Sequence, residues 1–99
     1  MSQYHKGRRL EYKVKKLLEK AGFTVFRCAG SKPIDLVAVK CDSDSKPIVL
    51  LVECKSSCIL PLRERKKIRD LARKTGARPI FAYPSNNRIV FHDLFEKRR

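Results

Sequence analysis

The sequence predicts an α/β domain built on a mixed β-sheet with a helix packed on each side or end. Two stretches repeat apolar residues at helical spacing, and five shorter runs are rich in β-branched and aromatic residues. Their order along the chain is α-β-β-β-α-β-β. Because 99 residues can bury one modest core, we expect a single domain over residues 1–99.

The first half of the chain accounts for one helix and three strands. A helix is predicted over residues 8–21 from the helical spacing of its apolar positions, and Gly22 is placed to end it. Strands are expected at 23–29, 34–40 and 48–52, separated by turn residues at 30–33 and a polar hairpin loop at 41–47.

The second half adds one helix and two strands. Pro61 is suited to start a helix over residues 62–75, which Gly76 follows. Its apolar stripe is formed by Ile68, Leu71, Ala72 and Thr75. Two further strands are expected at 78–84 and 88–95, joined by the turn SNN.

The charge balance points to a polyanionic partner. Lys and Arg number 24 against 10 Asp and Glu, a formal net charge of +14. Nucleic acid is the usual partner of such a chain, with an acidic membrane surface or a merely solvated basic surface as alternatives. No apolar run approaches the ~20 residues that span a bilayer, and the first residues lack a signal-peptide core. We therefore expect a soluble, cytoplasmic protein.

The cysteines predict free thiols. Cys28, Cys41, Cys54 and Cys58 contain no C-x-x-C pair, and the two histidines lie near opposite ends of the chain. The spacing of Cys54 and Cys58 falls within the range of zinc sites, so a structural zinc stays open as an alternative. Buried thiols in a reducing cytosol are the favoured interpretation.

Charged residues interrupt two otherwise apolar strands. The run over 48–52 continues directly into Glu53 and Lys55, and Asp35 lies within the preceding strand. Alternation places Glu53 and Lys55 on one face and Cys54 on the other. If the two strands pair through the 41–47 loop, Asp35 and Glu53 lie side by side. Neighbouring carboxylates repel each other unless a cation lies between them.

Magnesium fits these donors, because it prefers carboxylate, carbonyl, water and phosphate oxygens. A metal held by Asp35 and Glu53 would promote phosphodiester hydrolysis, and Lys55 would orient the water or stabilise the developing charge. Each residue also has a structural alternative. Glu53 and Lys55 can form a simple cross-pair, Asp35 can cap a turn, and Glu11 can pair with Lys15 at i+4.

Two motifs carry a resemblance to a known nuclease class. The stretches IDLVAV and LLVECK resemble the D…E-x-K signature of the restriction-endonuclease-like nucleases, with the proline displaced by one position. The longer stretch KGRRLEYKVKKLLEKAGFTVFRCAGSKPIDLVAV is similar to the N-terminal third of archaeal Holliday junction resolvases. The resemblance covers about residues 6–57 and implies a restriction-endonuclease-like sheet and a nuclease domain.

The resemblance also implies roles for individual residues. Asp35 and Glu53 would bind Mg²⁺, Glu11 would approach the metal through water, Lys55 would be the catalytic lysine, and Ser31 would assist cleavage. One or two metal ions per site are expected, with Mn²⁺ as a substitute. Tyr12 stands where some relatives carry Arg, which weakens any role for that position.

The implied substrate is branched double-stranded DNA, cut by a homodimer through paired nicks. Residues 1–7 would form a flexible basic arm. The residues predicted to contact nucleic acid are Lys6, Arg8, Arg9, Arg27, Lys32, Arg63, Lys66 and Lys67. Whether a sliding clamp or a helicase is a partner stays open. Two other functions stay open as well: a non-catalytic nucleic-acid-binding module, and a nuclease acting on other branched or damaged DNA.

Overall fold

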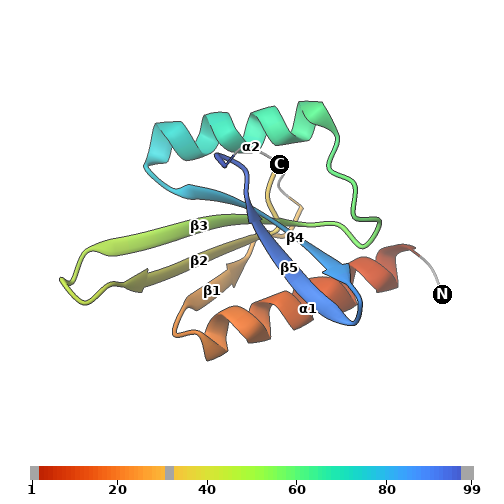
Figure 1. Ribbon diagram of the computed structural model, residues 1–99, viewed down its shortest axis with the longest axis horizontal. Helices are drawn as coiled ribbons and strands as arrows, with labels where there is room; N and C mark the ends of the chain where they lie inside the picture. Colours follow the sequence, from red (N-terminus) through yellow and green to blue (C-terminus); the bar gives the residue numbers. More distant parts are fainter. Residues whose placement is uncertain (1–2, 31–32, 97–99) are drawn as a thin grey trace.

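The computed structural model describes residues 3–30 and 33–96, with side chains from residue 7 onward. Its elements follow the predicted order α-β-β-β-α-β-β (Figure 1). They are α1 (Gln3–Lys20), β1 (Thr24–Arg27), β2 (Leu36–Cys41), β3 (Pro47–Cys54), α2 (Leu62–Thr75), β4 (Arg78–Ser85) and β5 (Arg88–Asp93).

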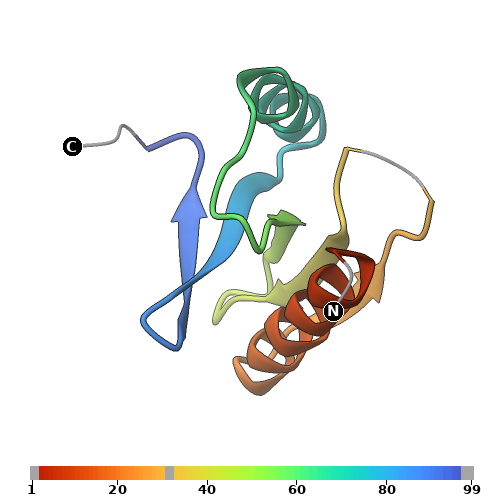
Figure 2. The same ribbon diagram turned by 90° about the vertical axis from the view of Figure 1, so that its right-hand side faces the viewer.

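The five strands form one mixed sheet in the order β1-β2-β3-β4-β5. Hairpin connections make β1–β2, β2–β3 and β4–β5 antiparallel, whereas β3 and β4 run parallel because α2 crosses over between them. Figures 1 and 2 show α1 and α2 on opposite faces of this sheet. The predicted fold class is therefore confirmed.

Each helix buries an apolar stripe against its own face of the sheet. Leu10, Val14 and Leu18 of α1 pack with strand residues that include Ala38 and Val52. On the other face, Ile68 and Ala72 of α2 pack with a second set that includes Leu51, Phe81 and Leu94. Val14 and Ile68 are completely buried, and truncating Ile68 to Ala should cost about 2–5 kcal/mol of stability. The core thus fixes both helices relative to the strand ends.

The end of α2 follows the sequence signal. Gly76 adopts a left-handed conformation (φ +77°), and its N–H donates to the carbonyl of Ala72. A residue with a Cβ adopts this conformation only with strain, which is why a glycine terminates the helix there.

The boundaries differ from the prediction in two informative places. Helix α1 begins at Gln3 rather than at residue 8, so residues 3–7, expected in a flexible arm, are helical; residues 1 and 2 lie outside the described part. Gly7 inside a helix costs only about 1 kcal/mol relative to Ala, so it does not stop the pattern. Strand β5 ends at Asp93 rather than at residue 95, because the Asp93 carboxylate accepts the N–H of Phe95 at 2.8 Å and turns the chain.

Among the described residues, no helix is long and apolar enough to cross a membrane.

Candidate active site at the end of β3

Two carboxylates meet where β2 begins and β3 ends. The antiparallel register pairs Leu36 with Val52, so the next position outward places Asp35 beside Glu53. The Asp35 N–H donates to the Val52 carbonyl at 2.9 Å, and the Cys54 N–H donates to Asp35 Oδ2 at 2.8 Å. Glu53 is fully buried and Asp35 is 8% exposed. The sheet therefore holds both acids at one end of its strands, side by side as the strand pattern predicts.

Lys55 continues the same strand into the site. Its N–H donates to the Ala82 carbonyl of β4 at 3.2 Å, which anchors the backbone after β3 has ended. Its ammonium lies 3.8 Å from Glu53 Oε2 and 3.0 Å from Oε1 of Glu64. Cys54 packs on the opposite, α1 side of the sheet, as alternation predicts.

Glu64 is the residue that sequence reasoning missed. It lies in the first turn of α2, where the helix dipole favours a negative charge, and it forms the closer of the two contacts of Lys55. A single acid in the first turn of a helix rich in Lys and Arg is the signal that could have pointed to it. Only the packing of α2 on the sheet shows that this acid meets Lys55.

Glu11 takes a different partner from those expected. Its Oε1 lies 3.3 Å from Nε of Arg27 at the end of β1, and the alternative pairing with Lys15 is wrong, because Lys15 pairs with Glu19 at 3.0 Å. Among the described residues, no group of three His, Cys, Asp or Glu side chains is placed to hold a metal ion. The structure thus joins Asp35 with Glu53 but does not bring Glu11 to them.

The donor set at the end of β3 fits a hard divalent cation. Carboxylate oxygens of Asp35 and Glu53 are the ligands that Mg²⁺ prefers, and a buried pair of acids with one lysine nearby retains excess negative charge.

Within the described part of the chain, the cysteine thiols form no comparable group of metal ligands. Partial burial, reinforced by the Asp35 carboxylate, raises the pKa of the Cys28 thiol, and the Cys58 thiol donates to the Pro84 carbonyl at 3.0 Å.

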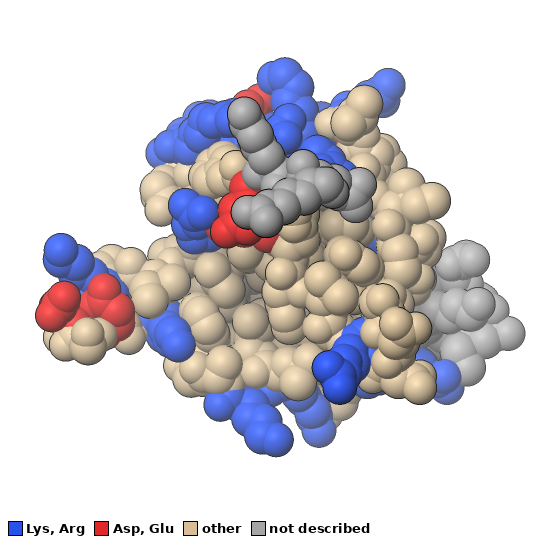
Figure 3. All heavy atoms as spheres, viewed as in Figure 1, with Lys and Arg blue, Asp and Glu red and all other residues tan. Residues whose placement is uncertain are grey.

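The predicted DNA-contacting residues fall on two surfaces. Figure 3 shows Lys and Arg gathered over α2 and again along the opposite edge of the molecule. Arg63 and Lys67 of α2 line a hollow of about 450 Å³ together with Glu64, next to Lys55. Lys66 is turned to the exposed helix surface and binds Asp70 at 2.8 Å.

The second basic surface lies at the start of α1. Arg8, Arg9 and Arg27 line one hollow there, and Arg27 lies at the same end of the sheet as Asp35, because β1 pairs Arg27 with Leu36. The Lys6 side chain, Ser31 and Lys32 lie outside the described residues. Their roles stay predictions.

The comparisons with known proteins agree on one family. The sequence pattern of the archaeal Holliday junction resolvase (Hjc) family matches residues 2–99. The crossover junction endodeoxyribonuclease Hjc of Methanocaldococcus jannaschii is 35% identical over an alignment of 97 residues, which covers 94% of this chain and 69% of that protein.

A solved structure extends this similarity to the fold. It is Archaeoglobus fulgidus Hjc, described as a Holliday junction resolvase from an archaeal hyperthermophile. It is similar to this chain with a TM-score of 0.71 and 29% identity, over 95% of this chain and 79% of that one. Since the family pattern covers nearly the whole length, the chain belongs to the archaeal Holliday junction resolvase family.

Proposed function

We propose that the chain is a single-domain, Mg²⁺-dependent endodeoxyribonuclease that resolves four-way DNA junctions by paired phosphodiester hydrolysis. The observation that carries the proposal is the group of Asp35, Glu53 and Lys55 at one end of the sheet, in a chain that belongs to a resolvase family. We propose cytoplasmic action, because the family is archaeal and the DNA of archaeal cells lies in the cytoplasm.

Asp35 and Glu53 would hold the metal, and Mn²⁺ would substitute for it. When bound, a divalent ion at this position supplies polarisation of the phosphodiester and a more acidic water. The Cys54 N–H donates to Asp35 Oδ2 and so orients this carboxylate for that task. Glu53 lies on β3, between β2 and β4, and the register pairs it with Phe81 of β4.

Lys55 would orient the attacking water or stabilise the charge that develops on phosphorus. Glu64 keeps the ammonium at the end of β3 at 3.0 Å, so the lysine is held in place before the substrate arrives. Arg27 would bind the backbone phosphate near the cut, with its guanidinium held by Glu11 at 3.3 Å. Glu11 therefore acts through Arg27 in this proposal, and Ser31 keeps the role that the resemblance implies.

A homodimer would supply the two active sites that paired nicks require. The surface we assign to the second copy is the part of the α2-side sheet face that α2 leaves uncovered. Phe26 is 57% exposed there, and its cross-strand neighbour Val37 lies half-buried on the same face with Val39 and Val49. An apolar strip of this kind is typical of a protein interface.

The proposal is tested with a labelled four-way junction and a linear duplex of the same sequence, each with Mg²⁺ or EDTA. Wild type should nick opposing strands of the junction symmetrically, only with the metal. Asp35→Asn should bind the junction without cutting it. Lys55→Ala should lose cleavage rate by about 100-fold with little loss of affinity.

Three outcomes would change the assignment. Equal cutting of the linear duplex contradicts a resolvase, and an inactive wild type favours a binding module. If the affinity of Lys55→Ala falls in parallel with its rate, Lys55 is a phosphate clamp rather than a catalytic group.

A further inference from the structure

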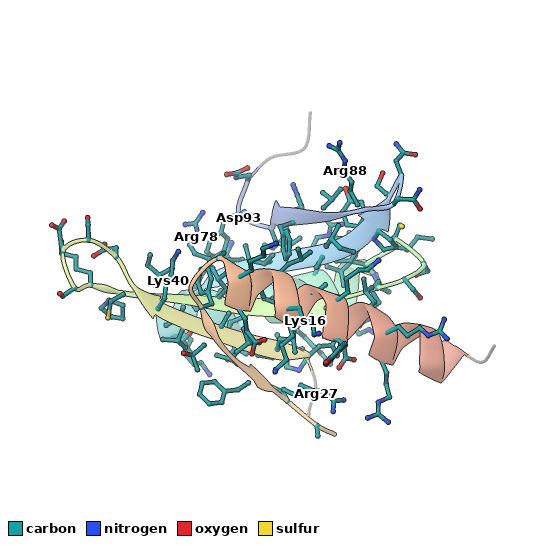
Figure 4. The ribbon with its side chains drawn as sticks, turned by 90° about the horizontal axis from the view of Figure 1, so that it is seen from below. Lys16, Arg27, Lys40, Arg78, Arg88 and Asp93 are labelled. Atoms are coloured by element: carbon teal, nitrogen blue, oxygen red, sulfur yellow. The ribbon has the colours of Figure 1, made fainter. Side chains whose placement is uncertain are left out.

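The aromatic ring of Tyr12 lies among arginine side chains beside the proposed active site. A hollow of about 290 Å³, which we call the arginine hollow, is lined by Arg8, Arg9, Tyr12 and Arg27. Figure 4 shows Arg27 at the end of β1, beside α1, with Lys16 further along the helix. Ligand sites range from about 300 to 1,000 Å³, so the hollow suits one small flat group rather than a large ligand.

The spacing along α1 assembles this hollow from residues of one helix face. Arg8 and Arg9 precede Tyr12 by four and three residues, the separations at which helix side chains are neighbours. Arg27 closes the hollow from β1, and its contact with Glu11 fixes it there. The hollow is therefore held by two elements that share the core, not by a loop.

Tyr12 is unusually exposed for an aromatic residue, at 60%. It lines the arginine hollow and also a second hollow, which Lys16 lines with Pro84 and Ile89. The Lys16 Nζ lies 4.8 Å from the ring centroid. Lys16 lines the second hollow and not the arginine hollow, so the ring contributes to the arginine hollow as well as contacting Lys16.

A π-face surrounded by guanidinium groups fits a nucleotide. Every nucleobase stacks on an aromatic ring, and arginines bind the flanking phosphates with paired N–H donors. In a linear duplex the bases are paired and stacked, so the ring gains nothing there. At the branch point of a junction, stacking is interrupted and a base can leave the stack at lower cost.

We propose that the arginine hollow takes one unstacked nucleobase from the branch point, with Tyr12 stacked on the base and Arg8 and Arg9 on its phosphates. This inference rests on the proposed function and deepens it. It gives the resolvase a means of distinguishing a junction from a duplex without reading sequence. It also gives Tyr12 a role at the position where some relatives carry Arg.

The test measures binding in EDTA, so that nothing is cut. Tyr12→Ala should weaken junction binding by about tenfold and leave linear-duplex binding unchanged, whereas Tyr12→Phe, which keeps the ring, should stay within about twofold of wild type. Phe91→Ala is the matched control, because Phe91 is an exposed aromatic on β5 that does not line the arginine hollow. It should bind both DNAs as wild type does.

Junctions with an abasic nucleotide at each branch-point position in turn make the test specific for the base. At one position, wild type should lose about tenfold in affinity, and Tyr12→Ala should lose nothing further. Arg9→Ala should instead weaken binding to both DNAs and reduce the slope of log affinity against log salt by about one.

The failures of the two proposals can be told apart. If wild type binds junction and duplex equally, the proposed function fails. If wild type prefers the junction and Tyr12→Ala keeps the full preference, only the nucleobase site is overturned. It is overturned equally if every abasic junction weakens wild type and Tyr12→Ala by the same factor.

Discussion

The two helices use their acidic residues in the same way. Helix α1 carries two acids, and one of them, Glu19, pairs with Lys15 on the exposed surface of its own helix. The other, Glu11, reaches Arg27 at the end of β1. In α2, Asp70 pairs with Lys66 within the helix, and Glu64 reaches Lys55 beyond the end of β3.

We call Glu11–Arg27 the α1 pair and Glu64–Lys55 the α2 pair. The surroundings of these two pairs differ. Lys55 is 28% exposed and also lies 3.8 Å from the buried Glu53 carboxylate, whereas Arg27 is 46% exposed and lines the arginine hollow. Charges held near a buried site act strongly on each other, and charges at an exposed surface are weakened by water and salt. We therefore propose that the Glu64–Lys55 pair serves the reaction and that the Glu11–Arg27 pair holds the DNA where the reaction occurs.

Replacing the buried acid Glu53 should cause the largest loss of cleavage rate. Glu53→Gln keeps the shape of a fully buried side chain but removes its charge, so cleavage should fall by about 1,000-fold or more. Junction binding should be retained. A buried charge costs stability, and Lys55 retains its ion pair with Glu64 in this variant. The Tm of the variant should therefore equal or exceed that of wild type. A variant that unfolds at much lower temperature would mean that Glu53 is a structural residue.

Disrupting the α1 pair should cause the next largest loss of cleavage rate. Glu11→Gln releases Arg27, and a misplaced phosphate-binding group can cost about 100-fold in single-turnover rate. Glu19→Gln, the matched control on the same helix, should stay within about twofold. If Glu11 acts through Arg27, adding Arg27→Ala to Glu11→Gln costs little more. Additive losses would place Glu11 at the metal instead.

Disrupting the α2 pair should lower the cleavage rate less, because the Lys55 ammonium still lies near the Glu53 carboxylate when Glu64 is replaced. Glu64→Gln should lower the single-turnover rate by about tenfold without changing junction affinity. Asp70→Asn is its control and should cut as wild type does. A rate for Glu64→Gln equal to that of wild type would show that Lys55 needs no support from α2.

The smallest effect concerns the Asp70 pair and its pH dependence. The hydrogen bond from Lys66 is the main cause that lowers the pKa of Asp70 below its ordinary value, with help from nearby basic charges. The stabilisation is therefore present above the ordinary carboxyl range and is lost as pH falls through the lowered value. Asp70→Asn should show a slightly reduced Tm at neutral pH, and the difference should disappear in acid.

The sequence predicted what depends on local pattern. Strand alternation correctly placed Glu53 and Lys55 on one face, and the hairpin between β2 and β3 brought Asp35 beside Glu53 as expected. These relations follow from the period of a strand and from a short connection, which the order of residues contains.

What the sequence could not predict depends on how separate elements pack. Whether Glu11 meets Lys15 or Arg27, and whether Glu64 meets anything, depends on where each helix lies on the sheet. The exposed ring of Tyr12 suggests a binding site only because three arginines line the same hollow, and one of them comes from β1. Side-chain partners across elements are set by the whole core rather than by spacing.

The central claim, that Asp35 and Glu53 hold the catalytic metal, is tested most directly by mapping the ion on the protein. Fe²⁺ in place of Mg²⁺, with ascorbate and peroxide, cuts the polypeptide where the metal is bound. We expect wild type to be cut near residues 35 and 53, with both cuts competed by Mg²⁺ and absent from Asp35→Asn. Cuts elsewhere in the chain, or cuts that Asp35→Asn leaves unchanged, would contradict the account.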